Sequence, residues 1–142
     1  MNRRDFLGVA GCGLLVAGCA SLVTHAVTPV AGVVKLDPKA LPELAKPGGT
    51  LRIHPAGHPE PIYVLRLEDA DGRAVFNAVS PICTHRGCTV EAQSTVLVCP
   101  CHGSTYSRSG TVLRGPAERP LRTYQTIVAS DGSVEIRLGG GL

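Results

Sequence analysis

The stretch from Cys83 to Tyr106 constrains this chain more than any other part of its sequence. It reads C-T-H-R-G-C, then ten residues, then C-P-C-H-G-S-T-Y, and it holds four of the six cysteines and two of the five histidines. Each of the two short loops mixes cysteine with histidine. Brought together, the loops supply two thiolates and two imidazoles for a metal centre, and they leave two cysteines that can pair with each other.

Several kinds of metal centre compete for these residues. A four-cysteine cluster requires four equivalent thiolates, and a zinc finger usually pairs cysteine with cysteine and histidine with histidine at short spacing. One cysteine and one histidine from each loop suit a [2Fe–2S] cluster in which one iron takes both cysteines and the other takes both histidines. A single zinc ion held beside a disulfide is the alternative that remains.

The same stretch resembles the Rieske iron–sulfur family. In that family the first Cys and the His of C-T-H-x-G-C, and the first Cys and the His of C-P-C-H-G-S, hold the cluster. The resemblance implies that two cysteines bind one iron and two histidines bind the other, and by position these ligands are Cys83, Cys99, His85 and His102. It also implies a disulfide between Cys88 and Cys101 that ties the two loops together.

Two hydroxyl side chains follow the second loop. In the high-potential branch of the family, the Ser and Tyr of H-G-S-x-Y donate hydrogen bonds to a bridging sulfide and to a ligand cysteine, and the matching residues are Ser104 and Tyr106. Neutral imidazoles leave the oxidised cluster uncharged, so it accepts an electron more easily than a four-thiolate cluster does. Potentials are about −150 to +300 mV for Rieske centres and about −400 mV for plant-type ferredoxins. The resemblance therefore implies one [2Fe–2S] cluster that carries electrons at high potential.

Short branched segments separated by turn residues predict an all-β fold. Strands are expected at 33–36, 51–53, 62–67, 75–79, 124–128 and 134–138, and turns at 69–72 and 130–132 predict two hairpins. Pro38 and Pro42 exclude a long helix between the first two strands. The resemblance implies a Rieske-type antiparallel β sandwich, six strands plus three, with a cluster-binding subdomain at about 80–121 inserted between base strands. This domain is expected to span 32–142, after a tether at 24–31.

The N-terminus carries a predicted export signal. Met1–Leu7, M-N-R-R-D-F-L, resembles a twin-arginine signal, and the run from Phe6 to Val23 is uncharged. Export in the folded state suits a protein whose cluster is assembled in the cytoplasm. The box Val16–Cys19 resembles a lipoprotein cleavage site, which would place lipid on Cys19. A retained membrane helix and a cleaved soluble form are the alternatives, so residues 1–23 are interpreted as a signal with a lipobox or as a membrane anchor.

Length and composition exclude several functions. With 142 residues, the chain has room for one domain and none for a separate catalytic domain. A formal net charge of +3, without clustered Lys and Arg, does not predict a nucleic-acid surface. A disulfide that shares its loops with a metal indicates an oxidising compartment, so the expected location is the periplasm or the outer face of the cytoplasmic membrane.

One-electron transfer is the expected function, because a cluster without an open coordination position relays electrons and does not transform a substrate. The resemblance implies the iron–sulfur subunit of an exported, membrane-associated quinol-oxidising complex of the cytochrome bc type. Its partners would be quinol, a cytochrome b and, as electron acceptor, a c-type cytochrome. Gly115–Leu121 resembles the proline-bearing loop that covers the cluster in such members, although Glu118 replaces its usual second proline and Ser107 replaces a frequent aspartate.

Other functions remain open at this stage. The first alternative is an electron-transfer subunit or carrier for a periplasmic molybdenum oxidase of the arsenite-oxidase type, which shares the export signal and the disulfide. The second is a zinc-stabilised lipoprotein without redox function. A cytoplasmic ferredoxin for ring-hydroxylating oxygenases is disfavoured, because those proteins lack the disulfide cysteines and the Ser and Tyr pair.

Overall fold

The computed structural model describes residues 22–140, and within them the chain forms two β-sheets and no α-helix. The larger sheet contains β1 (Thr24–Val27), β2 (Val33–Leu36), β3 (Thr50–Pro55), β4 (Ile62–Arg66), β5 (Phe76–Val79), β10 (Thr123–Val128) and β11 (Val134–Arg137). The smaller sheet contains β6 (Glu91–Ala92), β7 (Val96–Val98), β8 (Thr105–Ser107) and β9 (Val112–Arg114). The all-β prediction is confirmed, and all six predicted strands are present with boundaries that shift by at most two residues.

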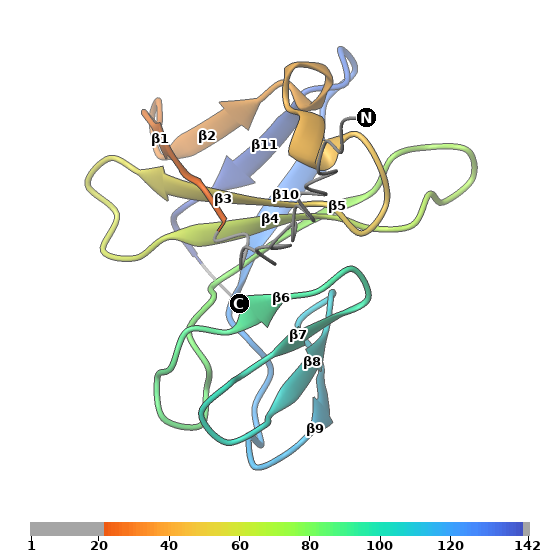
Figure 1. Ribbon diagram of the computed structural model, residues 1–142. Helices are drawn as coiled ribbons and strands as arrows, with labels where there is room; N and C mark the ends of the chain where they lie inside the picture. Colours follow the sequence, from red (N-terminus) through yellow and green to blue (C-terminus); the bar gives the residue numbers. More distant parts are fainter. Residues whose placement is uncertain (1–21, 141–142) are drawn as a thin grey trace, which may run out of the picture.

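The larger sheet has the order β1-β3-β4-β5-β10-β11-β2, and strand β10 lets it fold over on itself (Figure 1). Thr123 and Tyr124 of β10 pair with β5, whereas Gln125–Val128 pair with β11. A strand that changes partners along its length makes a corner, so the two halves of the sheet face each other across one core. We call this sheet and its connections the base subdomain. Its core contains Val34, Leu36, Leu44, Leu51, Ile53, Ile62, Val64, Phe76, Ala78, Tyr124, Val134 and Ile136.

The two prolines between β2 and β3 each start a three-residue 3-10 helix, η1 (Pro38–Ala40) and η2 (Pro42–Leu44). Asp37 caps η1, since its side chain accepts a hydrogen bond from the Lys39 N–H at 3.0 Å. Proline fits the first position of a helix, where its missing N–H costs nothing. Only Leu44 of these two turns is buried, and it fixes the segment against the core of the base subdomain.

The smaller sheet has the order β6-β7-β8-β9 and lies in the sequence between β5 and β10, so it is inserted into the base (Figure 1). We call residues 80–122 the inserted subdomain. The sheets have seven and four strands, against the six and three that we expected. Strand β1 and the four strands of the smaller sheet, β6–β9, were not predicted by residue, because segments of two to four residues have no clear hydrophobic periodicity.

Strand β4 joins the two subdomains because successive side chains of a strand point to opposite faces. Ile62 and Val64 enter the core of the base subdomain, whereas Tyr63 and Leu65 enter a second core that the inserted subdomain shares. Every residue of β4 is consequently buried. The second core contains Tyr63, Leu65, Val79, Cys83, Val90, Leu97, Cys99, Tyr106, Ala117 and Leu121.

Arg108 follows β8 and binds the inserted subdomain to the base through hydrogen bonds. Its Nη1 donates to Thr50 Oγ1 of the base at 3.1 Å, and its Nη2 donates to the Gly49 carbonyl of the base. Its Nη1 also donates to the Gln93 carbonyl at 2.6 Å, within the inserted subdomain. Asn77 Nδ2 donates back to the Arg108 carbonyl at 3.0 Å. Burial lowers the pKa of the Arg108 guanidinium below its ordinary value, so this contact holds a desolvated cation.

Both predicted hairpin turns are confirmed. Between β4 and β5, Ala70 pairs with Arg73 across Asp71 and Gly72, whose φ angles are 51° and 72°. Positive φ at both central residues matches the right-handed twist of the flanking strands, and Asp-Gly tolerates it well. Between β10 and β11, the Gly132 N–H donates to the Ala129 carbonyl at 2.9 Å.

The prediction of a tether at 24–31 is wrong for Thr24–Val27. These residues form β1, which pairs in parallel with β3 at one edge of the larger sheet. The His25 Nε2 atom also lies 3.2 Å from Glu43 Oε1 on η2. Both contacts join residues that are distant in the sequence, which is why the local pattern did not reveal them.

The export and lipidation predictions lie outside the described residues, since Arg3, Arg4 and Cys19 all precede Leu22. From residue 22 to residue 140, no helix has both the length and the apolar character that crossing a membrane requires. The interpretation of residues 1–23 as a signal with a lipobox or as a membrane anchor therefore stays a prediction.

Candidate metal centre

Two loops of the inserted subdomain share one hydrogen-bond pattern. In the first, the Cys83 N–H donates to the carbonyl of Cys88 at 2.8 Å, and the Gly87 N–H donates to the Cys83 carbonyl at 2.9 Å. In the second, the Cys99 N–H donates to the Ser104 carbonyl at 2.7 Å, and the Gly103 N–H donates to the Cys99 carbonyl at 3.0 Å. The two glycines have φ of 79° and 80°, where a side chain would be strained. The glycine in each motif therefore closes its loop.

The Cys83 thiol is buried and has no disulfide partner within the described chain. Burial opposes its ionisation, but hydrogen bonds from the Tyr106 hydroxyl, the His85 N–H, the Cys99 thiol and the Arg86 N–H outweigh that effect. The pKa of Cys83 is consequently lowered from its ordinary value. A sulfur that is stabilised as a thiolate is a good metal ligand, because the thiolate is the form that binds metals.

The Cys99 thiol is also buried and unbonded in the described chain, and it lies beside a disulfide. Cys88 and Cys101 are joined, and their sulfur atoms lie within 4.8 Å of the Cys99 sulfur. A disulfide sulfur offers no thiolate, so only Cys99 of these three can bind a metal. Burial raises the pKa of Cys99, although the N–H groups of Cys101 and His102 lower it in part. The bonded pair is the one that the family resemblance implies, and it links the two loops covalently.

The imidazoles of the two loops lie beside each other. The ring centroids of His85 and His102 lie 4.8 Å apart, and the ring planes are nearly perpendicular at 89°. His102 is exposed and His85 is half-buried. The Nδ1 atom of His85 is buried and has no hydrogen-bond partner among residues 22–140. An unpartnered buried nitrogen is costly unless it binds something, so this atom is available to a metal.

The donor set therefore fits a cofactor held by two cysteines and two histidines. The structure brings the Cys83 and Cys99 thiols into contact and the His85 and His102 rings to 4.8 Å, and it leaves two buried unbonded sulfurs and one unpartnered ring nitrogen in the described chain. Two sulfurs and two nitrogens suit a [2Fe–2S] cluster ligated unequally at its two irons, and they also suit tetrahedral zinc. Donor chemistry alone does not separate these two possibilities.

The Tyr106 hydroxyl lies against the first loop. It is 3.2 Å from Cys83 Sγ and 3.1 Å from Thr84 Oγ1, and it accepts a hydrogen bond from the Thr84 N–H at 3.2 Å. Thr84 Oγ1 donates its own proton to the Arg119 carbonyl at 2.7 Å, so the phenol proton is left for the Cys83 sulfur or the Thr84 oxygen. Burial, and the hydrogen bond to Cys83, raise the pKa of Tyr106 and keep it a donor.

The Ser104 hydroxyl belongs to the second loop and is fully buried. It accepts a hydrogen bond from the Ala117 N–H at 2.9 Å, and its own proton remains free to donate. Ala117 lies in the segment 115–121, which Thr84 also contacts at Arg119. This segment is thus fixed to both loops of the metal centre, as the resemblance to a covering loop implied.

Sequence reasoning missed three contributors to the site. Thr84 lies inside the C-T-H-R-G-C motif, and a hydroxyl next to a ligand was the signal that could have revealed it. Ala117 and Arg119 act through backbone groups, for which the residue type carries no signal. Their role depends only on how segment 115–121 packs against the two loops.

Comparisons with known proteins separate the two kinds of metal centre. A family profile described as Rieske [2Fe-2S] domain matches residues 41–125, more than half of the chain. The chain is 31% identical over 144 residues to the cytochrome b6-f complex iron-sulfur subunit of Chlorobaculum tepidum, covering 96% of this chain and 76% of that protein. It is 34% identical over 149 residues to the subunit of the same name from Synechococcus sp. (strain JA-3-3Ab), covering 92% and 84%.

A solved structure agrees with these relatives. The cyanobacterial plasma membrane Rieske protein PetC3 from Synechocystis PCC 6803 has a TM-score of 0.52 and 36% sequence identity, over 63% of this chain and 86% of that chain. The resemblance seen in the Cys83 to Tyr106 stretch therefore extends to the fold that holds it, and it favours the cluster over zinc.

Loss of the disulfide should weaken the centre without removing it. In Cys88→Ser and Cys101→Ser, we expect the metal centre to form but to be lost faster on warming, since a disulfide stabilises by about 2–4 kcal/mol. The visible spectrum during thermal unfolding measures this. Because both variants remove the same bond, they should behave alike and match the double variant. Unequal losses in the two single variants would mean that one of these cysteines has another role.

Proposed function

Since this chain belongs to the Rieske [2Fe–2S] family, we propose that it is the iron–sulfur subunit of an exported, membrane-associated quinol-oxidising complex, with a c-type cytochrome as electron acceptor. The observation that carries the proposal is the Tyr106 hydroxyl, 3.2 Å from Cys83 Sγ. A donor to a ligand sulfur favours the more negative reduced state, which raises the reduction potential toward the range where quinol can be oxidised. The relatives named cytochrome b6-f complex iron-sulfur subunit support this proposal.

In the proposed site, two cysteines hold one iron and two histidines hold the other, and these residues are Cys83, Cys99, His85 and His102. When bound, the [2Fe–2S] cluster supplies one-electron transfer at a potential higher than that of four-cysteine clusters. Cys83 and Cys99 are both buried, so the cysteine side of the site is shielded from water. Thr84 and Ser104 hold segment 115–121 over the two loops, so the protein surface beside the centre keeps a fixed shape.

The histidine side of the site suits contact with a partner. His102 is exposed and His85 is half-buried, so the imidazoles lie at the surface of the inserted subdomain. A quinol hydroxyl can donate a hydrogen bond to an exposed imidazole. The proton and the electron that the quinol gives up would then both leave it beside the same histidine.

The proposal can be tested in membranes of the native host. A strain that lacks the chain should lose quinol-dependent reduction of cytochrome c, the wild-type chain should restore it, and Cys99→Ser should not, because a thiolate ligand is missing. The matched control is Cys12→Ser, a cysteine outside the metal-centre loops. Intact quinol oxidation in the deletion strain, together with loss of arsenite oxidation, would replace this function with that of a molybdenum-oxidase partner.

The two hydroxyl donors should tune the potential. In Tyr106→Phe and in Ser104→Ala we expect the reduction potential to fall by roughly 40 mV each, because each variant loses one hydrogen bond that favours the reduced state, worth about 1 kcal/mol. Redox titration followed by the visible spectrum measures the change. Tyr124→Phe is the control, since its hydroxyl donates to Glu60 in the base subdomain. An unchanged potential in both hydroxyl variants would remove the main support for the high-potential assignment.

The location proposed here is the outer face of the cytoplasmic membrane, with the chain exported by its twin-arginine signal and anchored through lipid on Cys19 or through a retained helix. If Cys19 is lipidated, the mature chain should start at Cys19 with added acyl mass, and Cys19→Ala should remove that mass. Mass spectrometry of the membrane-bound protein measures both. An intact N-terminus would favour the retained helix over the lipid.

A further inference from the structure

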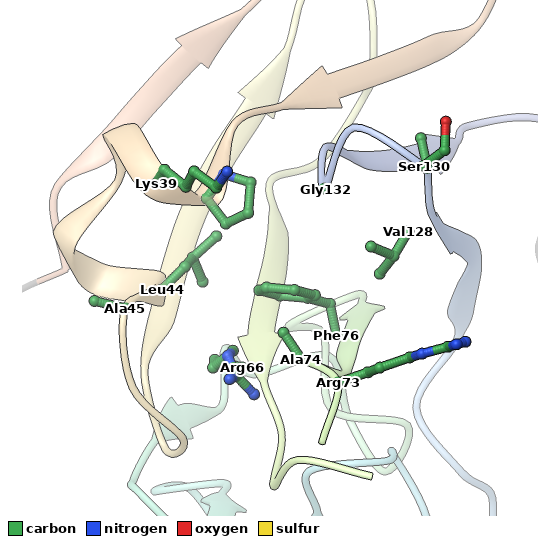
Figure 2. Close-up of a pocket in the computed structure, with 12 residues that line it drawn as sticks. Lys39, Leu44, Ala45, Arg66, Arg73, Ala74, Phe76, Val128, Ser130 and Gly132 are labelled. Carbon is green, nitrogen blue, oxygen red and sulfur yellow. The ribbon is translucent and has the colours of Figure 1, made fainter. Parts of the chain in front are cut away.

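A groove on the base subdomain takes no part in the metal centre. It has a volume of about 950 Å³ and lies between the η1–η2 segment and the turn that joins β10 to β11 (Figure 2). Ligand pockets have volumes of about 300–1,000 Å³ and are mostly apolar. The floor and walls include the buried Leu44 and Phe76 and the half-exposed Val128. The groove is therefore large enough, and apolar enough, to hold part of a small amphiphilic molecule.

The charged residues of the groove have one sign. Its lining, drawn from residues 22–140, contains three cations and no carboxylate. Arg66 is buried, pairs with Asp69 and lies over the Phe76 ring at 5.3 Å, so its charge is compensated. Lys39 and Arg73 are exposed, and neither has a carboxylate oxygen within 4.0 Å in the described chain. Two uncompensated cations above an apolar floor suit an anionic amphiphile.

The groove lies near the start of the described chain, and this bears on which ligand it would meet. His25 Nε2 lies 3.2 Å from Glu43 Oε1, and Glu43 immediately precedes Leu44 in the groove wall. Residues 1–21 end just before this contact, so an anchor in that segment, as proposed above, would bring the groove near lipid headgroups. The segment itself does not match the groove, because it carries Arg3 and Arg4 against a single acid.

We propose that this groove binds the headgroup of an anionic phospholipid, with Lys39 and Arg73 on the phosphate and Leu44, Phe76 and Val128 against the glycerol and the first acyl carbons. The inference rests on the proposed membrane association. A zwitterionic headgroup fits less well, since no carboxylate lines the described groove to pair with a choline. Bound lipid would hold the base subdomain against the bilayer in one orientation.

The test uses the full chain, loaded with iron and sulfide, in a nonionic detergent. Dihexanoyl phosphatidylglycerol is titrated while backbone amide shifts of Lys39, Ala45 and Gly132 are followed by NMR. We expect saturable shifts at these three amides. Dihexanoyl phosphatidylcholine and inorganic phosphate should each bind at least about tenfold more weakly, because the first adds a cation and the second lacks the apolar part.

Charge reversal supplies the matched comparison. Lys39→Glu/Arg73→Glu should weaken phosphatidylglycerol binding at least about tenfold, whereas Arg114→Glu/Arg137→Glu, with the same change of net charge on exposed strand residues, should not. Both variants should keep the iron content and reduction potential of the wild type, so failure here is distinct from failure of the proposed function. Equal binding of the two lipids, equal binding of phosphate, tighter binding of an oligoglutamate peptide, or no shift would each overturn the inference.

Discussion

Cys83→Ser and Cys99→Ser should abolish the cluster. The wild-type chain should hold two irons and two acid-labile sulfides with little zinc, and each variant should retain at least about tenfold less of both, because a serine hydroxyl ionises poorly and is a hard ligand where iron–sulfur clusters select soft thiolates. Iron, zinc and sulfide analysis of the purified protein measures the effect, together with the visible spectrum. No other substitution considered for this chain should have so large an effect on the centre.

A cysteine in the same loops provides the control. Cys88→Ser removes a sulfur from the first loop but not a proposed ligand, so its cluster should form. Loss of the spectrum in Cys88→Ser but not in Cys83→Ser would show that ligands and bridge have been exchanged. Stoichiometric zinc without labile sulfide in the wild type would contradict the cluster itself.

Arg108→Ala should cause the second large effect, a loss of about 3 kcal/mol in the free energy of unfolding, since hydrogen bonds to a charged group contribute about 1.5–3 kcal/mol and the buried Arg108 side chain also loses its packing. The substitution removes the donor to Gln93 within the inserted subdomain and the donors to Thr50 and Gly49, which join this subdomain to the base. Urea unfolding followed by far-UV circular dichroism measures the loss. The cluster spectrum should also disappear at a lower urea concentration, because the second core supports the metal-centre loops.

Three further variants separate hydrogen bonding from charge and packing. Arg108→Lys keeps the charge but cannot reach all three acceptors with a planar fork, so it should recover only part of the stability. Arg114→Ala removes an exposed arginine from the same subdomain and should cost less than about 0.5 kcal/mol. If Arg108→Met were as stable as the wild type, the hydrogen bonds would contribute little beyond packing, as some buried ionic groups do.

The metal-binding loops were predictable because their chemistry is local. Each loop closes through hydrogen bonds between residues at most five positions apart, and Gly87 and Gly103 have the positive φ that this closure requires. Residue type decides which side chains can bind iron, so Cys and His in mixed loops carried the signal. The hairpin at Asp71 and Gly72 was predictable for the same reason, since turn chemistry depends on neighbouring residues.

Contacts between distant residues were not predictable. Thr84 Oγ1 reaches the Arg119 carbonyl across 35 positions, and Arg108 reaches Thr50 across 58. Strand β1 was assigned to a tether because four residues of mixed polarity gain their pairing only when β3 lies beside them. The groove beside Lys39 and Arg73 likewise exists only where the η1 segment and the β10–β11 turn approach the same end of β5.

The sequence by itself determined the all-β class, most of the strands, and the kind of centre that two mixed Cys and His loops can hold, because periodicity, turn chemistry and ligand chemistry are properties of single residues and their near neighbours. Only the tertiary structure decided that Cys83 is the cysteine that Tyr106 contacts, that Thr84 and Ser104 bind segment 115–121, and that Arg108 joins the subdomains. These contacts depend on how two sheets pack around β4, and burial makes such long-range hydrogen bonds strong enough to shape the site.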